Sequence, residues 1–117
     1  PMSDILPPGS VIGILGGGQL GRMLSVAAAR LGYLTHIYEP GANPPAGHVA
    51  DRVTTASYDD AAALRAFASC VDVITYEFEN VPTAALDLLP APPANKVVLP
   101  GRAPSALGLE QYAQRFT

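Results

Sequence analysis

Three glycines with the spacing Gly-x-Gly-x-x-Gly stand near the start of the chain, at Gly16, Gly18 and Gly21. They follow the apolar run Val11–Leu15 and precede a helical pattern, so a strand, a tight turn and a helix are expected in that order. Glycine lets a ligand approach the backbone closely, and the unpaired N–H groups at a helix start favour an anion. The pattern therefore indicates a phosphate site. The alternative is that the glycines only allow a tight turn and close packing of helix on sheet.

An acidic residue, Glu39, directly follows the second apolar run, Leu34–Tyr38. In a dinucleotide-binding fold, an acid at the end of the second strand binds the ribose of the adenosine. Here Pro40 and Gly41 come next, so the alternative is a solvated strand end. The glycine motif and Glu39 together leave open an NAD-binding Rossmann domain of an oxidoreductase.

A second polar group, Glu77, Glu79 and Asn80, comes directly after the apolar run 71–76. Ligands of an open parallel sheet bind beyond the carboxyl ends of its strands, so this group and the glycine turn should converge. Alternation along an extended backbone places both carboxylates on one side. Carboxylates suit the hydroxyl groups or the amine of a ligand, whereas the alternative is a solvated loop.

Short β-branched runs that alternate with helical patterns predict an α/β protein, with a Rossmann-like open parallel sheet flanked by helices. Strands are expected at 11–15, 34–38, 52–55, 71–76 and 96–99, and helices at 19–31, 59–67 and 82–89. In the first helix, the residues that recur at helical spacing are Leu20, Met23, Leu24, Ala27, Ala28 and Leu31. The segment 39–47 contains three prolines and two glycines, which predicts a loop without regular structure.

Composition limits the classes of protein to which the 117-residue chain can belong. Its 49% of hydrophobic and 15% of charged residues argue against disorder, and a net charge of -3 gives no attraction for nucleic acid or anionic lipid. No apolar run reaches the roughly 20 residues that a membrane-spanning helix needs. The lone cysteine, Cys70, fits a reducing cytoplasm and is expected to be a buried, inert thiol. His36 and His48 lack further ligands at metal spacing, so packed or solvated histidines are expected and no metal site.

Three segments together carry a resemblance to a known family: GGGQLGRM at 16–23, YEP at 38–40 and TYEFENVP at 75–82. With them the chain resembles the N-terminal domain of the 5-(carboxyamino)imidazole ribonucleotide synthetases, which belong to the ATP-grasp superfamily. The resemblance implies a Rossmann-like pre-ATP-grasp domain without NAD over residues 11–103, after a lead-in over 1–10. Residues 104–117 are expected to be the truncated or gapped start of a linker to a missing ATP-grasp domain.

The family resemblance also implies a function, that of an ATP-dependent ligase of purine biosynthesis. Such a ligase carboxylates 5-aminoimidazole ribonucleotide with bicarbonate, and a cytoplasmic homodimer is expected. ATP and Mg²⁺ would bind mainly outside this chain, which alone is expected to be inactive and to hold no catalytic residue. The substrate-binding residues that the resemblance and the glycine turn imply are Gly17, Gly18, Gln19, Leu20, Glu77, Glu79 and Asn80.

Overall fold

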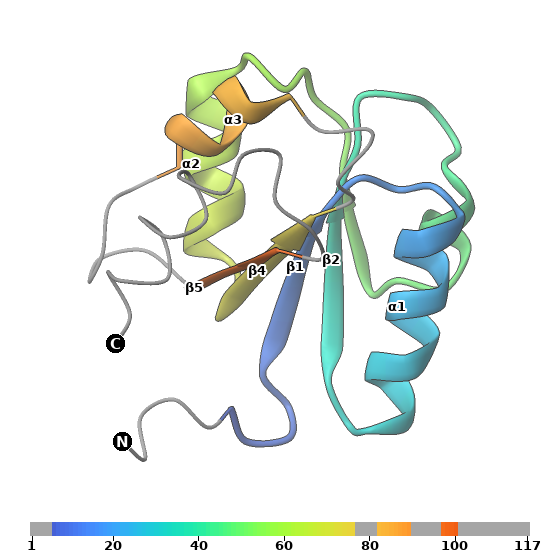
Figure 1. Cartoon of the computed structure of the whole chain (residues 1–117). Helices are drawn as coiled ribbons and strands as arrows, with labels where there is room; N and C mark the ends of the chain where they lie inside the picture. Colours follow the sequence, from blue (N-terminus) through green and yellow to red (C-terminus); the bar gives the residue numbers. More distant parts are fainter. Residues whose placement is uncertain (1–5, 77–81, 90–96, 101–117) are drawn as a thin grey trace.

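The computed structural model describes residues 6–76, 82–89 and 97–100, which form an open sheet with helices on both faces. Five strands pair in parallel in the order β3-β2-β1-β4-β5 (Figure 1). They are β1 (Val11–Leu15), β2 (Leu34–Tyr38), β3 (Arg52–Thr54), β4 (Val73–Tyr76) and β5 (Val97–Pro100). The predicted α/β class and parallel sheet are confirmed. Because the strand order reverses between β1 and β4, the crevice at which such sheets bind ligands lies at the ends of these two strands.

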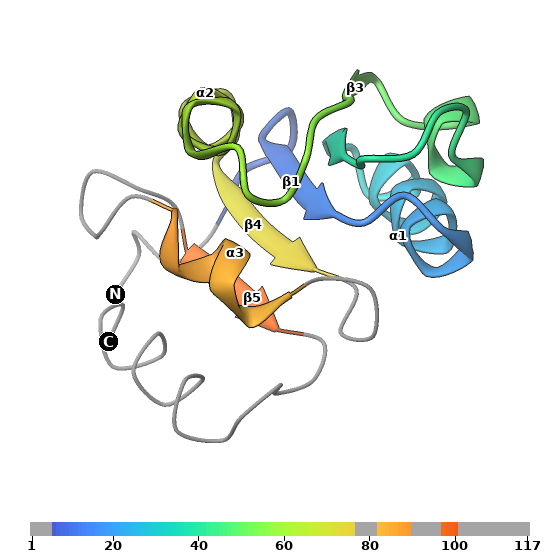
Figure 2. The same ribbon diagram turned by 90° about the horizontal axis from the view of Figure 1, so that it is seen from above.

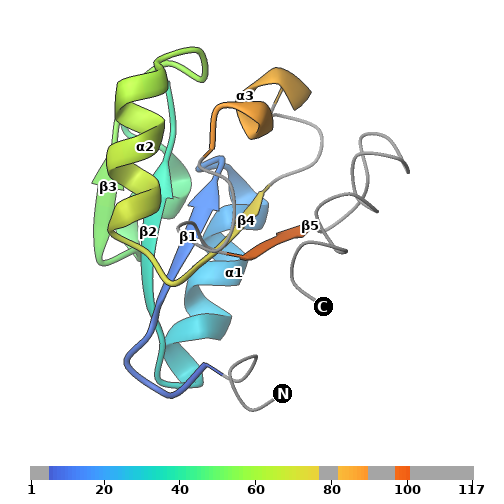
Figure 3. The ribbon, with the colours of Figure 1, turned by 90° about the vertical axis from the view of Figure 1, so that its left-hand side faces the viewer.

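The helices lie on opposite faces of this sheet. Figure 2 and Figure 3 show α1 (Gln19–Arg30) on one face and α2 (Ala61–Ser69) on the other. A short helix, α3 (Thr83–Asp87), precedes β5. The helix α2 begins after Asp60, whose carboxylate caps it by accepting the Ala63 N–H at 3.0 Å. None of the described helices is long and apolar enough to cross a membrane.

One expectation for the segment 39–47 is wrong. Its end is not an irregular loop, because Pro45–His48 forms a 3₁₀ helix, η2, which packs against α1. Proline at the first positions of a helical turn is favourable, since the N–H that it lacks would have no partner there. The prolines of this segment therefore favour the start of a helical turn and do not exclude regular structure.

The larger core lies between the sheet and α2. Its buried side chains come from β1, β2, β4, α2 and the end of the α3 region, and include Leu15, Tyr38, Leu64, Phe67, Ile74, Tyr76 and Leu89. Gly13 in β1 makes room for this packing, because a Cβ there would lie 2.7 Å from Phe67 Cζ and 3.0 Å from both Cγ atoms of Val71. The close contact of α2 with the sheet therefore depends on a residue without a side chain.

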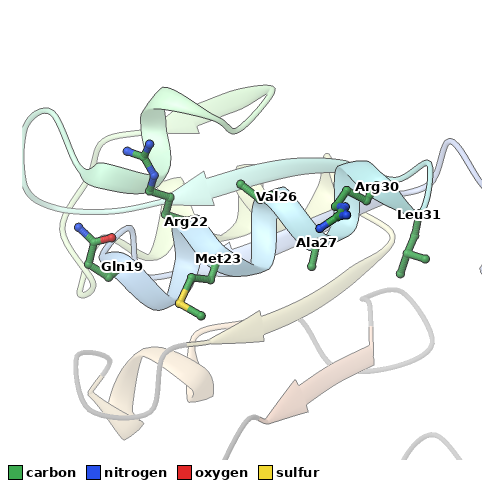
Figure 4. A pocket seen from close by; sticks show the side chains of 7 residues that line it. All are labelled: Gln19, Arg22, Met23, Val26, Ala27, Arg30 and Leu31. Carbon is green, nitrogen blue, oxygen red and sulfur yellow. The ribbon is translucent and has the colours of Figure 1, made fainter.

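The core between the sheet and α1 is smaller, and its fully buried residues are Ile14, Ile37 and Ala46. The buried residues of α1 are small, namely Gly21, Ser25 and Ala28. The Ser25 hydroxyl donates to the Gly21 carbonyl at 2.8 Å, so it stays satisfied inside the fold. Exposed apolar side chains lie on the outer face of α1 and at its end, where Met23 is 67% exposed and Leu31, the C-cap residue, is 70% exposed (Figure 4).

Candidate functional site

The ends of β1 and β4 lie side by side at the crevice. Leu15, the last residue of β1, pairs in register with Tyr76, the last residue of β4. The glycine turn after Leu15 and the chain after Tyr76 therefore leave the sheet at the same edge. Three of the predicted site residues, Glu77, Glu79 and Asn80, follow Tyr76 but lie outside the described residues. Their convergence with the turn stays a prediction.

The glycine turn leads directly into α1. Gly16 has a φ of +109°, a left-handed conformation that favours glycine, and its N–H donates to the Tyr38 carbonyl at 2.8 Å. Gly18 is the N-cap residue of α1, with a φ of -77° and no side-chain cap. The predicted site residues Gln19 and Leu20 are the first two residues of the helix, and both are exposed. Their N–H groups have no acceptor within the helix and lie at its positive end, so they can donate to an anion.

Gly17, by contrast, has both of its backbone polar groups paired within the chain. Its N–H donates to Glu39 Oε1 at 2.8 Å, and its carbonyl accepts the Ala46 N–H at 2.9 Å. The residue is buried, and a Cβ at this position would lie 2.7 Å from the Cβ of Pro44. Glycine at position 17 therefore allows Pro44 of the same chain to lie close to the turn.

Glu39 points into the turn. Its second carboxylate oxygen, Oε2, accepts the Gly41 N–H at 2.8 Å, so both oxygens bind backbone N–H groups. This pairing was not predicted from the sequence, where Glu39 was matched to the ribose-binding acid of dinucleotide folds. The signal that could have indicated it is the group of prolines at 40, 44 and 45, which folds the following segment back over the turn.

Two further titratable side chains, His36 and Tyr38 of β2, are buried against Phe67 of α2. His36 packs edge-on against Phe67, with Nε2 2.7 Å from the Thr54 hydroxyl oxygen, and its burial and then the charge of Arg52 lower the pKa of its imidazole. Burial, and then the nearby carboxylates Asp60 and Asp59, raise the pKa of Tyr38. Among residues 6–76, 82–89 and 97–100, no three or more His, Cys, Asp or Glu side chains cluster as metal ligands would.

The expectation that Cys70 is buried is wrong. Its thiol is exposed, because α2 ends at Ser69 and Cys70 is the C-cap residue beyond it. The buried positions of this helix are Leu64, Phe67 and Ala68, and the exposed Ser69 and Cys70 connect them to the next buried residue, Val71.

An open parallel sheet with a glycine turn at its switch point defines a Rossmann-like ligand-binding domain. The chain belongs to the family of ribonucleotide synthetase preATP-grasp domains, whose model matches residues 10–111. It is 56% identical to the N5-carboxyaminoimidazole ribonucleotide synthase of Brucella melitensis biotype 1 over 112 aligned residues. The alignment covers 96% of this chain and 29% of that relative.

Solved structures of similar proteins have the same fold. With the N5-carboxyaminoimidazole synthetase of Staphylococcus aureus complexed with ADP, the TM-score is 0.66 and the identity 43%, over 71% of this chain and 23% of the other. With the N5-carboxyaminoimidazole synthase of Aspergillus clavatus in complex with ADP and 5-aminoimidazole ribonucleotide, the TM-score is 0.58 and the identity 40%, over 68% and 21%. The chain thus spans less than a third of the length of these relatives.

Proposed function

We propose that this chain is the ribonucleotide-binding N-terminal part of an ATP-dependent ligase that carboxylates 5-aminoimidazole ribonucleotide in purine biosynthesis. The names of the relatives support this activity, and the Aspergillus clavatus relative was solved with that ribonucleotide. The observation that carries the proposal is the pairing in register of Leu15 with Tyr76. Because of this pairing, the glycine turn and the YEFEN segment, residues 76–80, start from the same edge of the sheet. The same comparisons give no support to the alternative of an NAD-dependent oxidoreductase.

In the proposed site, the glycine turn and the YEFEN segment bind different parts of the ribonucleotide. The N–H groups of Gln19 and Leu20 donate to an anionic group of the ligand at the positive end of α1. Glu77 accepts hydrogen bonds from the ribose hydroxyls or from the amine, and Glu79 and Asn80 support it. Gly17 shapes the turn through its close contact with the segment 39–47, and Gly18 ends the turn at the start of α1 without a side chain that could cover the ligand.

The proposed reaction forms a C–N bond between the exocyclic amine of the ribonucleotide and the carbon of bicarbonate. Bicarbonate first takes the γ-phosphoryl group of ATP to give carboxyphosphate and ADP. The amine then attacks the carboxyl carbon and loses a proton, and phosphate leaves. Because amine and carboxyphosphate must meet in one geometry, the task of this domain is to hold and orient the ribonucleotide.

ATP is proposed to bind outside this chain. Mg²⁺ supplies charge neutralisation around a transferring phosphoryl group. This chain covers 29% of the Brucella melitensis relative and 23% of the Staphylococcus aureus relative that was solved with ADP, so most of such a ligase lies outside the matched part. We therefore assign ATP, Mg²⁺ and bicarbonate activation to the remainder of a cytoplasmic, homodimeric ligase, and the chain alone is expected to be inactive.

Glu77→Gln tests the proposal, in a full-length ligase in which this chain replaces the matching 112 residues of the Brucella melitensis relative. The amide keeps the shape of the carboxylate but removes a charge-assisted hydrogen bond worth about 1.5–3 kcal/mol. We expect kcat/KM for the ribonucleotide to fall by about one to two orders of magnitude, with KM for ATP unchanged.

Asp72→Asn is the matched control for Glu77→Gln. The Asp72 carboxylate accepts the Val11 N–H at 2.8 Å, at the opposite end of β1 from the crevice. This change should leave the use of the ribonucleotide unaltered. A folded Glu77→Gln enzyme with unchanged kcat/KM for the ribonucleotide would show that Glu77 is a surface carboxylate and would remove the basis of the proposed site.

A further inference from the structure

The segment 39–47 lies against the glycine turn, which in dinucleotide-binding Rossmann folds binds the pyrophosphate. Two hydrogen bonds join the segment 39–47 to Gly17, one from the Gly17 N–H to Glu39 and one from the Ala46 N–H to the Gly17 carbonyl. Ala46 is completely buried, and η2 packs on α1. The segment 39–47 is thus part of the fold on this side of the sheet.

Within the segment 39–47, Glu39 and Pro44 lie nearest to the space that a side chain at position 17 would occupy. In a dinucleotide-binding turn, the second glycine of the motif, here Gly18, leaves space for the pyrophosphate, and the acid after the second strand faces the ribose. Gly17 directly precedes Gly18, and a Cβ on Gly17 would lie 2.7 Å from Pro44 Cβ and 3.1 Å from Glu39 Cβ, so the chain fills the space on this side of the turn. Both Glu39 oxygens are already engaged, by the N–H groups of Gly17 and Gly41.

The carboxylate of Glu39 also has an electrostatic effect on the turn. It accepts the Gly17 N–H in the manner of a phosphate oxygen, so one donor of the turn is already bound to an anion. A second phosphate at this place would have to displace a negative charge or lie beside it, and like charges at short range repel. The first N–H groups of α1, at Gln19 and Leu20, are left for an anionic group of a ligand.

We propose that Glu39 is a positioning and specificity-determining residue, which holds the segment 39–47 on the glycine turn and restricts the turn to ligands with a single phosphate. The segment takes the place of the second phosphate of a diphosphate ligand. This inference deepens the proposed function, since it concerns the same turn and selects a ribonucleotide monophosphate over a dinucleotide.

Amide hydrogen exchange of the 117-residue chain tests the positioning role of Glu39. In Glu39→Ala, the N–H groups of Gly17 and Gly41 lose their acceptor, and we expect both to exchange about tenfold faster or more. Glu39→Gln keeps one carbonyl acceptor, so only one of the two amides should exchange faster. The matched control Asp72→Asn, which removes a carboxylate that accepts one backbone N–H elsewhere, should leave both rates unchanged. Unaltered exchange of Gly17 in Glu39→Ala would overturn the positioning role.

Binding of inorganic phosphate and pyrophosphate, followed by the amide resonances of the turn, tests the specificity role. We expect the wild-type chain to bind pyrophosphate no more tightly than phosphate, with Gln19 and Leu20 responding and Gly17 silent. In Glu39→Ala, the ratio of the two affinities should shift toward pyrophosphate by about tenfold, and Gly17 should respond.

An unchanged affinity ratio in Glu39→Ala, or a response of Gly17 in the wild type, would overturn the specificity role. The two proposals can fail separately. If no amide of the wild-type turn responds to either anion or to 5-aminoimidazole ribonucleotide, the proposed function loses its site, while the exchange rates of Gly17 and Gly41 still decide the role of Glu39.

Discussion

The two faces of the sheet are packed in different ways. On the α2 face, large side chains such as Leu64 and Phe67 are completely or almost completely buried against Tyr38 and Ile74. On the α1 face, the fully buried side chains are few, and the helix contributes small buried residues and the partly buried Leu24. Apolar burial is the dominant favourable term in folding, so the α2 face is expected to supply most of the stability of this chain.

The α1 face has a different task, because it carries the glycine turn. Small residues at Gly21, Ser25 and Ala28 let the backbone of α1 approach its neighbours closely. The absence of a side chain at Gly17 likewise allows the segment 39–47 to lie on the turn, where Glu39 accepts the Gly17 N–H. The proposed site thus lies on the face with less apolar packing, where hydrogen bonds and close backbone contacts determine the geometry.

The largest expected difference between the two faces follows from Phe67→Ala. The ring is 1% exposed and packs against both His36 and Tyr38, so its removal leaves a cavity. We expect the free energy of unfolding in urea to fall by about 3–5 kcal/mol. A loss below about 1 kcal/mol would show that the α2 face is not the main source of stability.

Gly13→Ala and Gly17→Ala together test how well each face of the sheet tolerates an added methyl group. The new Cβ would lie 2.7 Å from Phe67 Cζ, inside the larger core, and overpacking of this kind costs about 1–3 kcal/mol. Gly17→Ala adds the same group on the other face, against Pro44. We expect its main effect to be faster exchange of the Ala46 N–H, as the segment 39–47 is pushed from the turn. Equal exchange rates at Ala46 in wild type and Gly17→Ala would contradict the close contact.

The pH dependence of stability should reveal the buried imidazole on the α2 face. Because the pKa of His36 is lowered in the folded state, the unfolded chain binds a proton more readily below the ordinary value of 6.5. The contribution of His36 to stability is therefore complete above pH 6.5 and decreases as the pH falls below it. Urea unfolding at a series of pH values should show this decrease in the wild type and a smaller one in His36→Gln. Identical pH profiles for the two proteins would contradict it.

The smallest expected effect is that of Met23→Lys on the outer face of α1. The side chain is 67% exposed, and surface substitutions of this kind change stability by about 0.5 kcal/mol or less. The unfolding midpoint in urea should therefore match that of the wild type. A loss of more than about 1 kcal/mol would show that this face is covered in solution, and the two faces would then differ less than the structure indicates.

The order and type of most elements could be predicted from local pattern. The β-branched runs at 11–15 and 34–38 became strands with the expected bounds, and Asp60 caps a helix that was expected to begin at Asp59. Helix boundaries moved by one or two residues because a capping residue itself lies outside the helix. The glycine turn was also correctly placed between strand and helix, since its spacing and flanking periodicity are both local.

Other features were decided by residues far apart in the chain. Glu39 was matched to a ribose ligand, yet it binds the N–H of Gly17, 22 positions away, because the prolines that follow bring their segment over the turn. Of the apolar residues that recur at helical spacing in this region, Ala28 is buried and Leu24 packs against the smaller core, whereas Leu20, Met23 and Leu31 are exposed. Periodicity identifies an apolar face of a helix without specifying which neighbour, if any, will cover it.

The α/β class, the family and the residues of the proposed site follow from local sequence, because strand propensity, helix capping and glycine spacing act over a few neighbouring residues. The contact of Gly17 with Pro44, the inward orientation of Glu39 and the pairing of the ends of β1 and β4 became visible in the folded chain. These contacts depend on which backbones can approach each other once the sheet has formed, and this is a property of the packed molecule rather than of any one segment.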